Sequence, residues 1–118
     1  MKRAVISCGG GNRVGELCDM AAYEMVRQNL ADKKICTGKF IKGEDFIIRT
    51  LNRYGQITIL EACSSLCVSE KIIGLLPEKN IQVICLPRQG FTKDNITDIQ
   101  KSLDILMDKL HAYFQRVA

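Results

Sequence analysis

Residues 57–63 read ITILEAC, a run of β-branched and apolar side chains that predicts a buried strand. Residues 64–67 read SSLC and lead into a short apolar segment, which predicts a helix from Cys67 to Leu76 that Pro77 ends. A strand followed closely by a helix is the unit that builds parallel α/β sheets. We therefore expect the same unit to recur along the chain.

Three further strands and three further helices are predicted on the same grounds. The strands are expected at 3–8, 34–37 and 81–86, and the helices at 13–29, 44–54 and 94–117. Alternating strands and helices indicate right-handed crossovers and a parallel sheet covered on both faces. We predict a single three-layer α/β domain over residues 1–118, Rossmann-like or flavodoxin-like. It would have about four parallel strands, helices on both faces and a long C-terminal helix.

Composition excludes several classes of protein. Of the 118 residues, 47% are hydrophobic and 25% are charged, which is ordinary for a globular domain and excludes disorder. No apolar run approaches the roughly 20 residues of a membrane helix, and the N-terminal apolar stretch is too short for a signal peptide, so we expect a cytoplasmic protein. The net charge of +4 comes from scattered Lys and Arg, and there is no Trp, so nucleic-acid binding is not indicated.

Cysteine is unusually frequent, with six Cys against one His. A reducing compartment does not favour structural disulfides, so these thiols require metal ligation, redox chemistry or burial as an explanation. Four of them end the four predicted strands: Cys8, Cys36, Cys63 and Cys85. Parallel strands end along one edge of the sheet, which is where open α/β sheets bind ligands. Cys67 opens the following helix and returns to the same edge.

We therefore predict a metal site made by Cys8, Cys36, Cys63 and Cys67. Thiolates in a tetrahedral set select zinc or an iron–sulfur cluster, and the three residues between Cys63 and Cys67 suit paired zinc ligands. The loop amides of Gly9, Gly10 and Gly11 would favour the negative charge of such a site. Cys18 and Cys85 are predicted to be buried core residues.

Two other uses of these thiols stay open. Cys8 and Arg13 bracket a glycine loop that is similar to the anion loop of thiol phosphatases and arsenate reductases, with Cys8 as nucleophile and Arg13 as anion clamp; it is one residue shorter. Cys63 and Cys67 would instead form a reversible disulfide, although redox pairs usually have two intervening residues. A dinucleotide-binding loop is not indicated, since Val14 stands where its third glycine belongs.

The last predicted helix carries a continuous apolar stripe. Its members recur in steps of three and four: Ile96, Ile99, Leu103, Leu106, Leu110, Tyr113 and Val117. The simpler interpretation is a helix that lies on the sheet with this face toward the core. The alternative is a two-helix seam in a homodimer, because a run of three heptads suits knobs-into-holes packing.

These residues together resemble the DGC domain family of small zinc-binding proteins, over about residues 4–90 and without the final helix. Cys8 and Gly15 keep the spacing of that family, Ala21-Ala22 follow in the first helix, and Cys36 matches its second cysteine. Residues 61–63, which read EAC, stand where the naming Asp-Gly-Cys triplet belongs. Cys67 follows four residues later.

The resemblance implies a zinc ion carried by the four cysteines and no defined reaction. Two positions depart from the family pattern, with Glu61 in place of Asp and Ala62 in place of Gly. All four cysteines are kept, so the departures bear on the acidic residue more than on metal binding. We expect Glu61 to cap a helix or to support the metal site by orienting its ligands without binding the ion itself.

Overall fold

The computed structural model describes residues 2–9 and 12–117. Four strands form one parallel sheet: β1 (Arg3–Ser7), β2 (Lys33–Cys36), β3 (Gln56–Glu61) and β4 (Asn80–Cys85). Their order in the sheet is β2-β1-β3-β4, so the chain builds outward from β1 first in one direction and then in the other. The C-terminal ends of β1 and β3 flank this reversal, which is the position where such sheets bind ligands.

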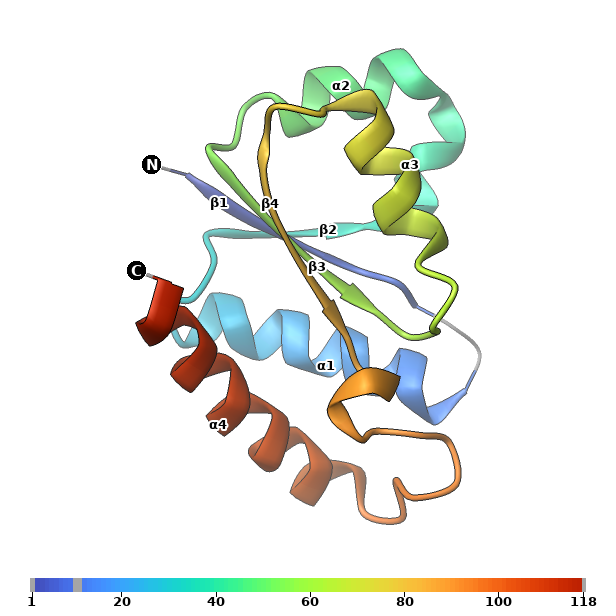
Figure 1. Ribbon diagram of the computed structural model, residues 1–118, viewed down its shortest axis with the longest axis vertical. Coiled ribbons are helices and arrows are strands. Elements are labelled where there is room, and N and C mark those ends of the chain that lie inside the picture. The colour runs from blue at the N-terminus through green and yellow to red at the C-terminus, as the bar shows by residue number, and fades with distance from the viewer. Residues whose placement is uncertain (1, 10–11, 118) are drawn as a thin grey trace.

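Helices cover both faces of the sheet (Figure 1), so the predicted three-layer α/β architecture is confirmed. On one face lie α1 (Arg13–Arg27) and α4 (Ile99–Val117), and on the other lie α2 (Glu44–Leu51) and α3 (Cys67–Leu75). Two short 3-10 helices were not predicted. They follow β2 and β4 at Thr37–Lys42 (η1) and Pro87–Gln89 (η2).

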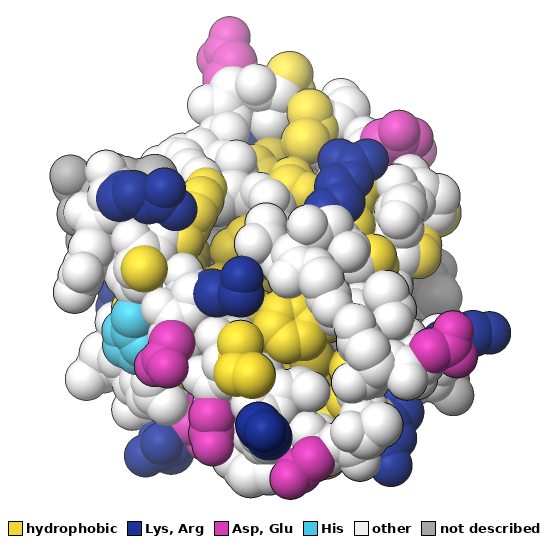
Figure 2. Space-filling model, turned by 60° about the horizontal axis from the view of Figure 1, so that its bottom comes forward, with side chains coloured by type: hydrophobic (Ala, Val, Ile, Leu, Met, Phe, Trp, Pro, Cys, Tyr) yellow, Lys and Arg dark blue, Asp and Glu magenta, His cyan; other side chains and the backbone are white. Residues whose placement is uncertain are grey.

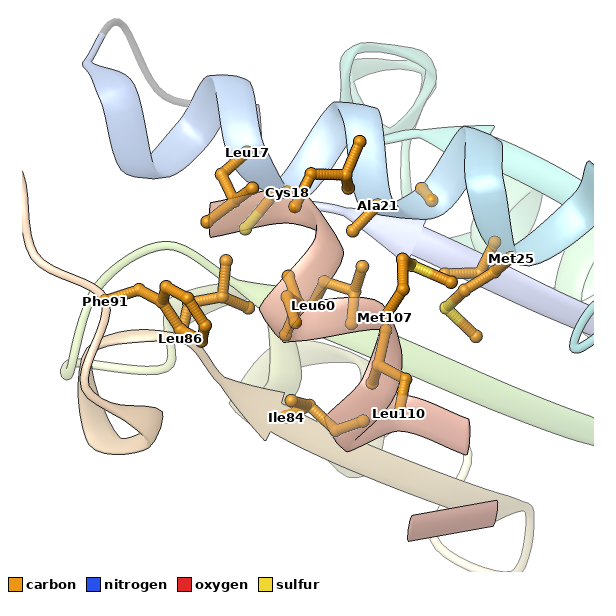
Figure 3. Close-up of a cluster of buried hydrophobic side chains, with 14 of the residues drawn as sticks. Leu17, Cys18, Ala21, Met25, Leu60, Ile84, Leu86, Phe91, Met107 and Leu110 are labelled. Carbon is orange, nitrogen blue, oxygen red and sulfur yellow. The ribbon is translucent and has the colours of Figure 1, made fainter. Parts of the chain in front are cut away.

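Side chains of alternate strand residues point to opposite faces of the sheet, so the protein has two separate hydrophobic cores. Between the sheet and helices α1 and α4, Leu60 and Ile84 pack with Leu17, Met25 and other apolar side chains (Figure 3). On the opposite face, the neighbouring strand residues pack against α2 and α3. That second core comprises Ala4, Ile6, Ile35, Ile47, Leu51, Ile57, Ile59, Ile72 and Leu76.

Several helix boundaries differ from the prediction. Helix α2 ends at Leu51 and not at residue 54, and α3 ends at Leu75, one residue earlier than predicted. Helix α4 begins at Ile99 and not at residue 94, because the Asp98 carboxylate accepts a hydrogen bond from the backbone N–H of Lys101 at 3.2 Å and so caps the first turn. Helix α1 ends at Arg27 and not at residue 29, since Asn29 has a φ of 64°, in the left-handed region that ends many helices.

The apolar stripe of α4 faces the core of its own chain. Leu103, Leu106 and Leu110 are buried in the core shared with α1, whereas Ile105 on the outer side is 45% exposed. The core-facing interpretation is therefore confirmed, and the homodimer through this helix stays a prediction. The side chain of Val117 lies outside what the structure describes.

Charged side chains of both signs are mixed on the face that Figure 2 shows. Figure 2 shows one face, on which Lys and Arg side chains are scattered among Asp and Glu and form no stripe. Within residues 2–9 and 12–117, no helix combines the length and apolar character that crossing a membrane requires.

Candidate functional site

Five cysteines gather at the C-terminal edge of the sheet, as predicted. Cys8 follows β1 directly, Cys36 and Cys85 are the last residues of β2 and β4, Cys63 comes two residues after β3, and Cys67 is the first residue of α3. The order of the strands then sets their neighbours. Cys36 lies at the outer strand β2, and Cys8 lies between it and the turn that carries Cys63 and Cys67.

The turn from Cys63 to Cys67 holds two sulfur atoms around one hydroxyl group. Ser65 Oγ lies 3.0 Å from Cys63 Sγ and 3.2 Å from Cys67 Sγ, so the two sulfurs are within about 6 Å of each other. Leu66 takes a left-handed conformation, with a φ of 54°, and this closes the turn at the start of α3. The sequence analysis did not single out Ser65, although its place midway between two cysteines was the available signal.

Hydrogen bonds favour the thiolate form of Cys63. The Ser65 hydroxyl is the main cause of a lowered Cys63 pKa, and the backbone N–H groups of Ser65 and Leu66 add to it. The side chains of Cys63 and Cys67 are both exposed to solvent. This turn therefore presents two solvent-accessible sulfurs. In Cys63 the local hydrogen bonds stabilise the thiolate form.

Cys8 lies beside this turn on the neighbouring strand. Its backbone N–H donates to the carbonyl of Leu60 at 3.0 Å and so continues the β1–β3 ladder by one residue. The Cys8 thiol is half-buried, and burial is the main cause of its raised pKa. The N–H of Ala62 lowers that pKa, while the charges of Glu61 and then of Cys63 and Cys67 raise it. Cys8 is therefore electrostatically coupled to both thiols of the turn.

Glu61 is a fully buried carboxylate at the centre of this edge. It is 0% exposed, and its Oε2 accepts a hydrogen bond from the backbone N–H of Ser69, in the first turn of α3, at 2.9 Å. The predicted role of Glu61 as a helix cap is confirmed. Its second oxygen, Oε1, is buried and has no hydrogen-bond partner among the described residues, and neither does the buried Ser69 Oγ.

Cys36 points to the other face of the sheet. It lines a surface hollow with Tyr23 and Arg27 of α1, and Lys34 Nζ lies 3.4 Å from its sulfur. Cys67 instead lines a hollow with Phe40, Ile47 and Ile72 on the side of α2 and α3. The structure therefore brings the sulfurs of Cys63 and Cys67 close together, and it directs Cys36 toward α1 on the opposite face of the sheet.

The side chains do not stand in a ready metal geometry. Within the part of the chain that the structure describes, no three Cys, His, Asp or Glu side chains are grouped closely enough to hold an ion without moving. Cys63 and Cys67 are exposed, so rotation about their Cα–Cβ bonds meets no core packing. Zinc ligation by the four predicted cysteines stays a prediction.

The loop after β1 gives limited support to an anion site. Gly10 and Gly11 lie outside the described residues, and the exposed Arg13 is the first residue of α1. The Asn12 side chain already accepts hydrogen bonds from the N–H groups of Val14 and Gly15, which are amides that a bound anion would need. Burial also opposes ionisation of the Cys8 thiol. The enzyme alternative with Cys8 as nucleophile gains no support here.

The two remaining cysteines belong to the core, as predicted. Cys18 is 0% exposed between α1 and α4 (Figure 3), and burial raises its pKa well above that of an ordinary thiol. Cys85 is also buried, and its Sγ lies 3.6 Å from the carbonyl oxygen of Cys63. Cys85 thus packs beneath the turn that carries the exposed sulfurs.

Comparison with known proteins gives one match. A family model described as the DGC domain matches residues 4–104 of the chain. The match extends past residue 90, where the sequence analysis expected the resemblance to end, and reaches the first third of α4. No curated protein and no solved structure matches the chain.

Proposed function

Because the chain belongs to the DGC domain family, we propose that it binds a zinc ion through thiolates at the C-terminal edge of its sheet. Cys8, Cys63 and Cys67 are the side chains that would hold the ion, with Cys36 as the fourth ligand that the sequence predicts. Thiolates, here one after β1 and two in the turn between β3 and α3, are the soft donors that zinc prefers in proteins.

The geometry of the turn at 63–67 carries this proposal. One hydroxyl group lies within hydrogen-bond distance of both sulfurs, so the side chains of Cys63 and Cys67 converge on one point. Cys8 follows the adjacent strand β1, and its backbone N–H bonds to the carbonyl of Leu60 in β3. These residues supply the soft thiolate donors that zinc prefers, and their side chains would have to move to enclose an ion.

The surroundings favour the negative charge of such a site. The start of α3 lies at Cys67, and a helix N-terminus favours anions because its backbone N–H groups point outward. The amides of Ser65 and Leu66 lower the pKa of Cys63, and the amide of Ala62 acts in the same direction on Cys8. When bound, zinc would cross-link the end of β1 to the β3–α3 turn. All six cysteines are free, which suits the reducing cytoplasm that we propose as the location.

Elemental analysis of the reduced protein, purified without added metal or chelator, tests the proposal. We expect about one zinc per chain, as for a structural site with protein ligands. The variants Cys63→Ser and Cys67→Ser should each lose most of the metal, because a neutral hydroxyl is a poor ligand for zinc. Cys18→Ala is the matched control, since Cys18 lies in the core between α1 and α4. It should retain the full zinc content.

Zinc absent from the reduced wild-type protein, and not taken up when zinc is added, would refute the proposal. Full retention of zinc by Cys63→Ser and Cys67→Ser would refute the assignment of the site to this turn. Neither result depends on an enzymatic activity, so the proposal is tested by metal content alone.

A further inference from the structure

We infer that Cys63 and Cys67 form a reversible disulfide by exchange with a low-molecular-weight disulfide. The turn that carries them would then exist in a dithiol form and a disulfide form. This inference does not presuppose the proposed zinc binding, because it concerns two sulfur atoms and needs no metal ion. It follows from the hydroxyl that both sulfurs contact, from the exposure of their side chains, and from the contacts that hold the two ends of the turn.

The two sulfur atoms already lie close to each other. Ser65 Oγ is 3.0 Å from Cys63 Sγ and 3.2 Å from Cys67 Sγ, so the sulfurs are within about 6 Å of each other. The sulfur atoms of a disulfide are about 2 Å apart. All three side chains are exposed, so each can rotate about its Cα–Cβ bond. Formation of the disulfide therefore requires the hydroxyl to turn outward and the sulfurs to close, without a change in the hydrophobic cores.

Contacts with the ends of the strands hold both ends of this turn. At the first end, the Sγ of Cys85, the last residue of β4, lies 3.6 Å from the Cys63 carbonyl oxygen. At the second end, the Ser69 N–H bonds to Glu61 and so fixes the first turn of α3, which Cys67 opens. The two cysteines are therefore near each other before any reaction. Forming the bond orders little additional chain, so the entropy cost of the reaction is small.

The other cysteines differ from this pair in exposure or in position. Cys18 and Cys85 are buried and Cys8 is half-buried, which limits the access of a small disulfide to their sulfurs. Cys36 is exposed, but it faces α1 on the opposite side of the sheet, with Lys34 Nζ 3.4 Å from its sulfur. Cys36 can therefore react with the same reagent and serves as a reference thiol outside the turn.

The reaction consists of two exchange steps. In the first step, the thiolate of one cysteine attacks a sulfur of the small disulfide, whose S–S bond breaks, and one half of the reagent leaves as a thiolate. In the second step, the thiolate of the other cysteine attacks the protein sulfur of this mixed disulfide and releases the second half. The protein has then given two electrons to the small disulfide, and the two protons of its thiols pass to the two small thiolates that leave.

Mass spectrometry of tryptic peptides tests the inference on the full chain. Cleavage after Lys and Arg leaves both cysteines of the turn on one peptide, residues 54–71, and each of the other four on a peptide of its own. Reduced protein, kept free of metal by a chelator, is incubated with oxidised glutathione, and the remaining thiols are then alkylated. We expect peptide 54–71 to lose two hydrogen atoms and to carry no glutathione. The peptide that contains Cys36 should gain one glutathione.

Two serine variants trap the mixed disulfide. Cys63→Ser and Cys67→Ser each lack the thiol of the second step, so peptide 54–71 should keep one glutathione in both. Ser64→Ala is the matched control, since it changes an exposed side chain of the same turn and keeps both sulfurs. Its peptide should oxidise as in the wild type. At about 10 μM protein, closure within one chain should exceed disulfide-linked dimerisation about 100-fold, because groups on a short linker reach effective concentrations of about 1 mM.

Three results would overturn the inference. They are a wild-type peptide 54–71 that carries two glutathiones, one that stays reduced while Cys36 has reacted, and a disulfide that excess reduced glutathione does not reopen. Far-ultraviolet circular dichroism of each reduced variant confirms that the fold is kept. Because the protein is metal-free throughout, failure of the disulfide leaves the proposed zinc binding intact, and a protein that binds no zinc leaves the disulfide intact.

Discussion

Glu61 and Ser69 are joined by a buried hydrogen bond of 2.9 Å, in which the Ser69 backbone N–H donates to the Glu61 carboxylate. The bond links the last residue of β3 to the first turn of α3. It satisfies one of the N–H groups that every helix leaves free at its start. The carboxylate thus fixes the position of the start of α3, and therefore of Cys67, relative to the end of β3.

This bond predicts unequal effects of two substitutions on the metal-free protein. Glu61→Ala leaves the Ser69 amide buried without an acceptor and should cost about 1–3 kcal/mol of unfolding free energy. Glu61→Gln keeps an acceptor oxygen and should cost about 1 kcal/mol or less. Urea unfolding in the presence of a chelator measures both. Equal losses for the two variants would contradict a capping role for this side chain.

The hydroxyl of Ser65 predicts a change in thiol reactivity. Because it is the largest cause of the lowered Cys63 pKa, Ser65→Ala should raise that pKa. The thiolate fraction at neutral pH then falls, so Cys63 should be alkylated more slowly at pH 7 and its rate–pH profile should move to higher pH. Peptide mass spectrometry of metal-free protein after timed iodoacetamide treatment measures the rate at this residue.

Ser64→Ala is the control for that experiment. Ser64 is an exposed neighbour in the same turn, and among the described residues its backbone carbonyl accepts a hydrogen bond from Arg88 while its hydroxyl makes none. Its removal should leave the profile of Cys63 unchanged. A Ser65→Ala profile that coincides with that of the wild type would show that the hydroxyl does not act on the thiolate.

Gly9 lies against the carboxylate of Asp19, so its substitution should destabilise the fold. A Cβ at position 9 would come within 3.1 Å of Asp19 Oδ2, and Asp19 is held by a 2.5 Å hydrogen bond from the Ser7 hydroxyl. Gly9→Ala should therefore cost about 1 kcal/mol, as overpacking typically does. At Gly38 a Cβ meets nothing within 4 Å. Gly38→Ala should leave the unfolding free energy nearly unchanged. Thermal unfolding of both variants measures this difference. A similar loss of stability in the two variants would rule out the steric explanation.

Adjacent residues of α4 predict opposite results for truncation. Leu106 is 0% exposed, so Leu106→Ala should cost about 2–5 kcal/mol through the cavity it leaves. Ile105 is 45% exposed, and Ile105→Ala should change the unfolding free energy by less than about 0.5 kcal/mol. Urea unfolding at several protein concentrations measures both. A large loss at Ile105 that depends on concentration would instead indicate that the outer face of α4 is covered by a second chain.

The order of elements could be read from the sequence because it depends on local patterns. The run at 57–63, the glycine loop after the first strand and the spacing of apolar residues in α1 and α4 each reflect the period of a strand or a helix. The boundary of α4 could not be read in this way. Residues 94–98 continue the apolar spacing through Ile96, but the Asp98 carboxylate caps the helix one residue before Ile99.

The collection of cysteines at one edge also followed from the sequence, because parallel strands must all end on the same side. The sequence did not show which sulfurs lie on the same face of the sheet, because a shift of one residue turns a side chain to the opposite face of a strand. Cys36 ends β2 one residue after the buried Ile35, and only the packing of Ile35 against α2 decides that Cys36 faces α1. The tertiary structure likewise decided that Glu61 caps α3 with one oxygen and leaves the other without a partner among the described residues. That outcome depends on where the start of α3 lies against the end of β3.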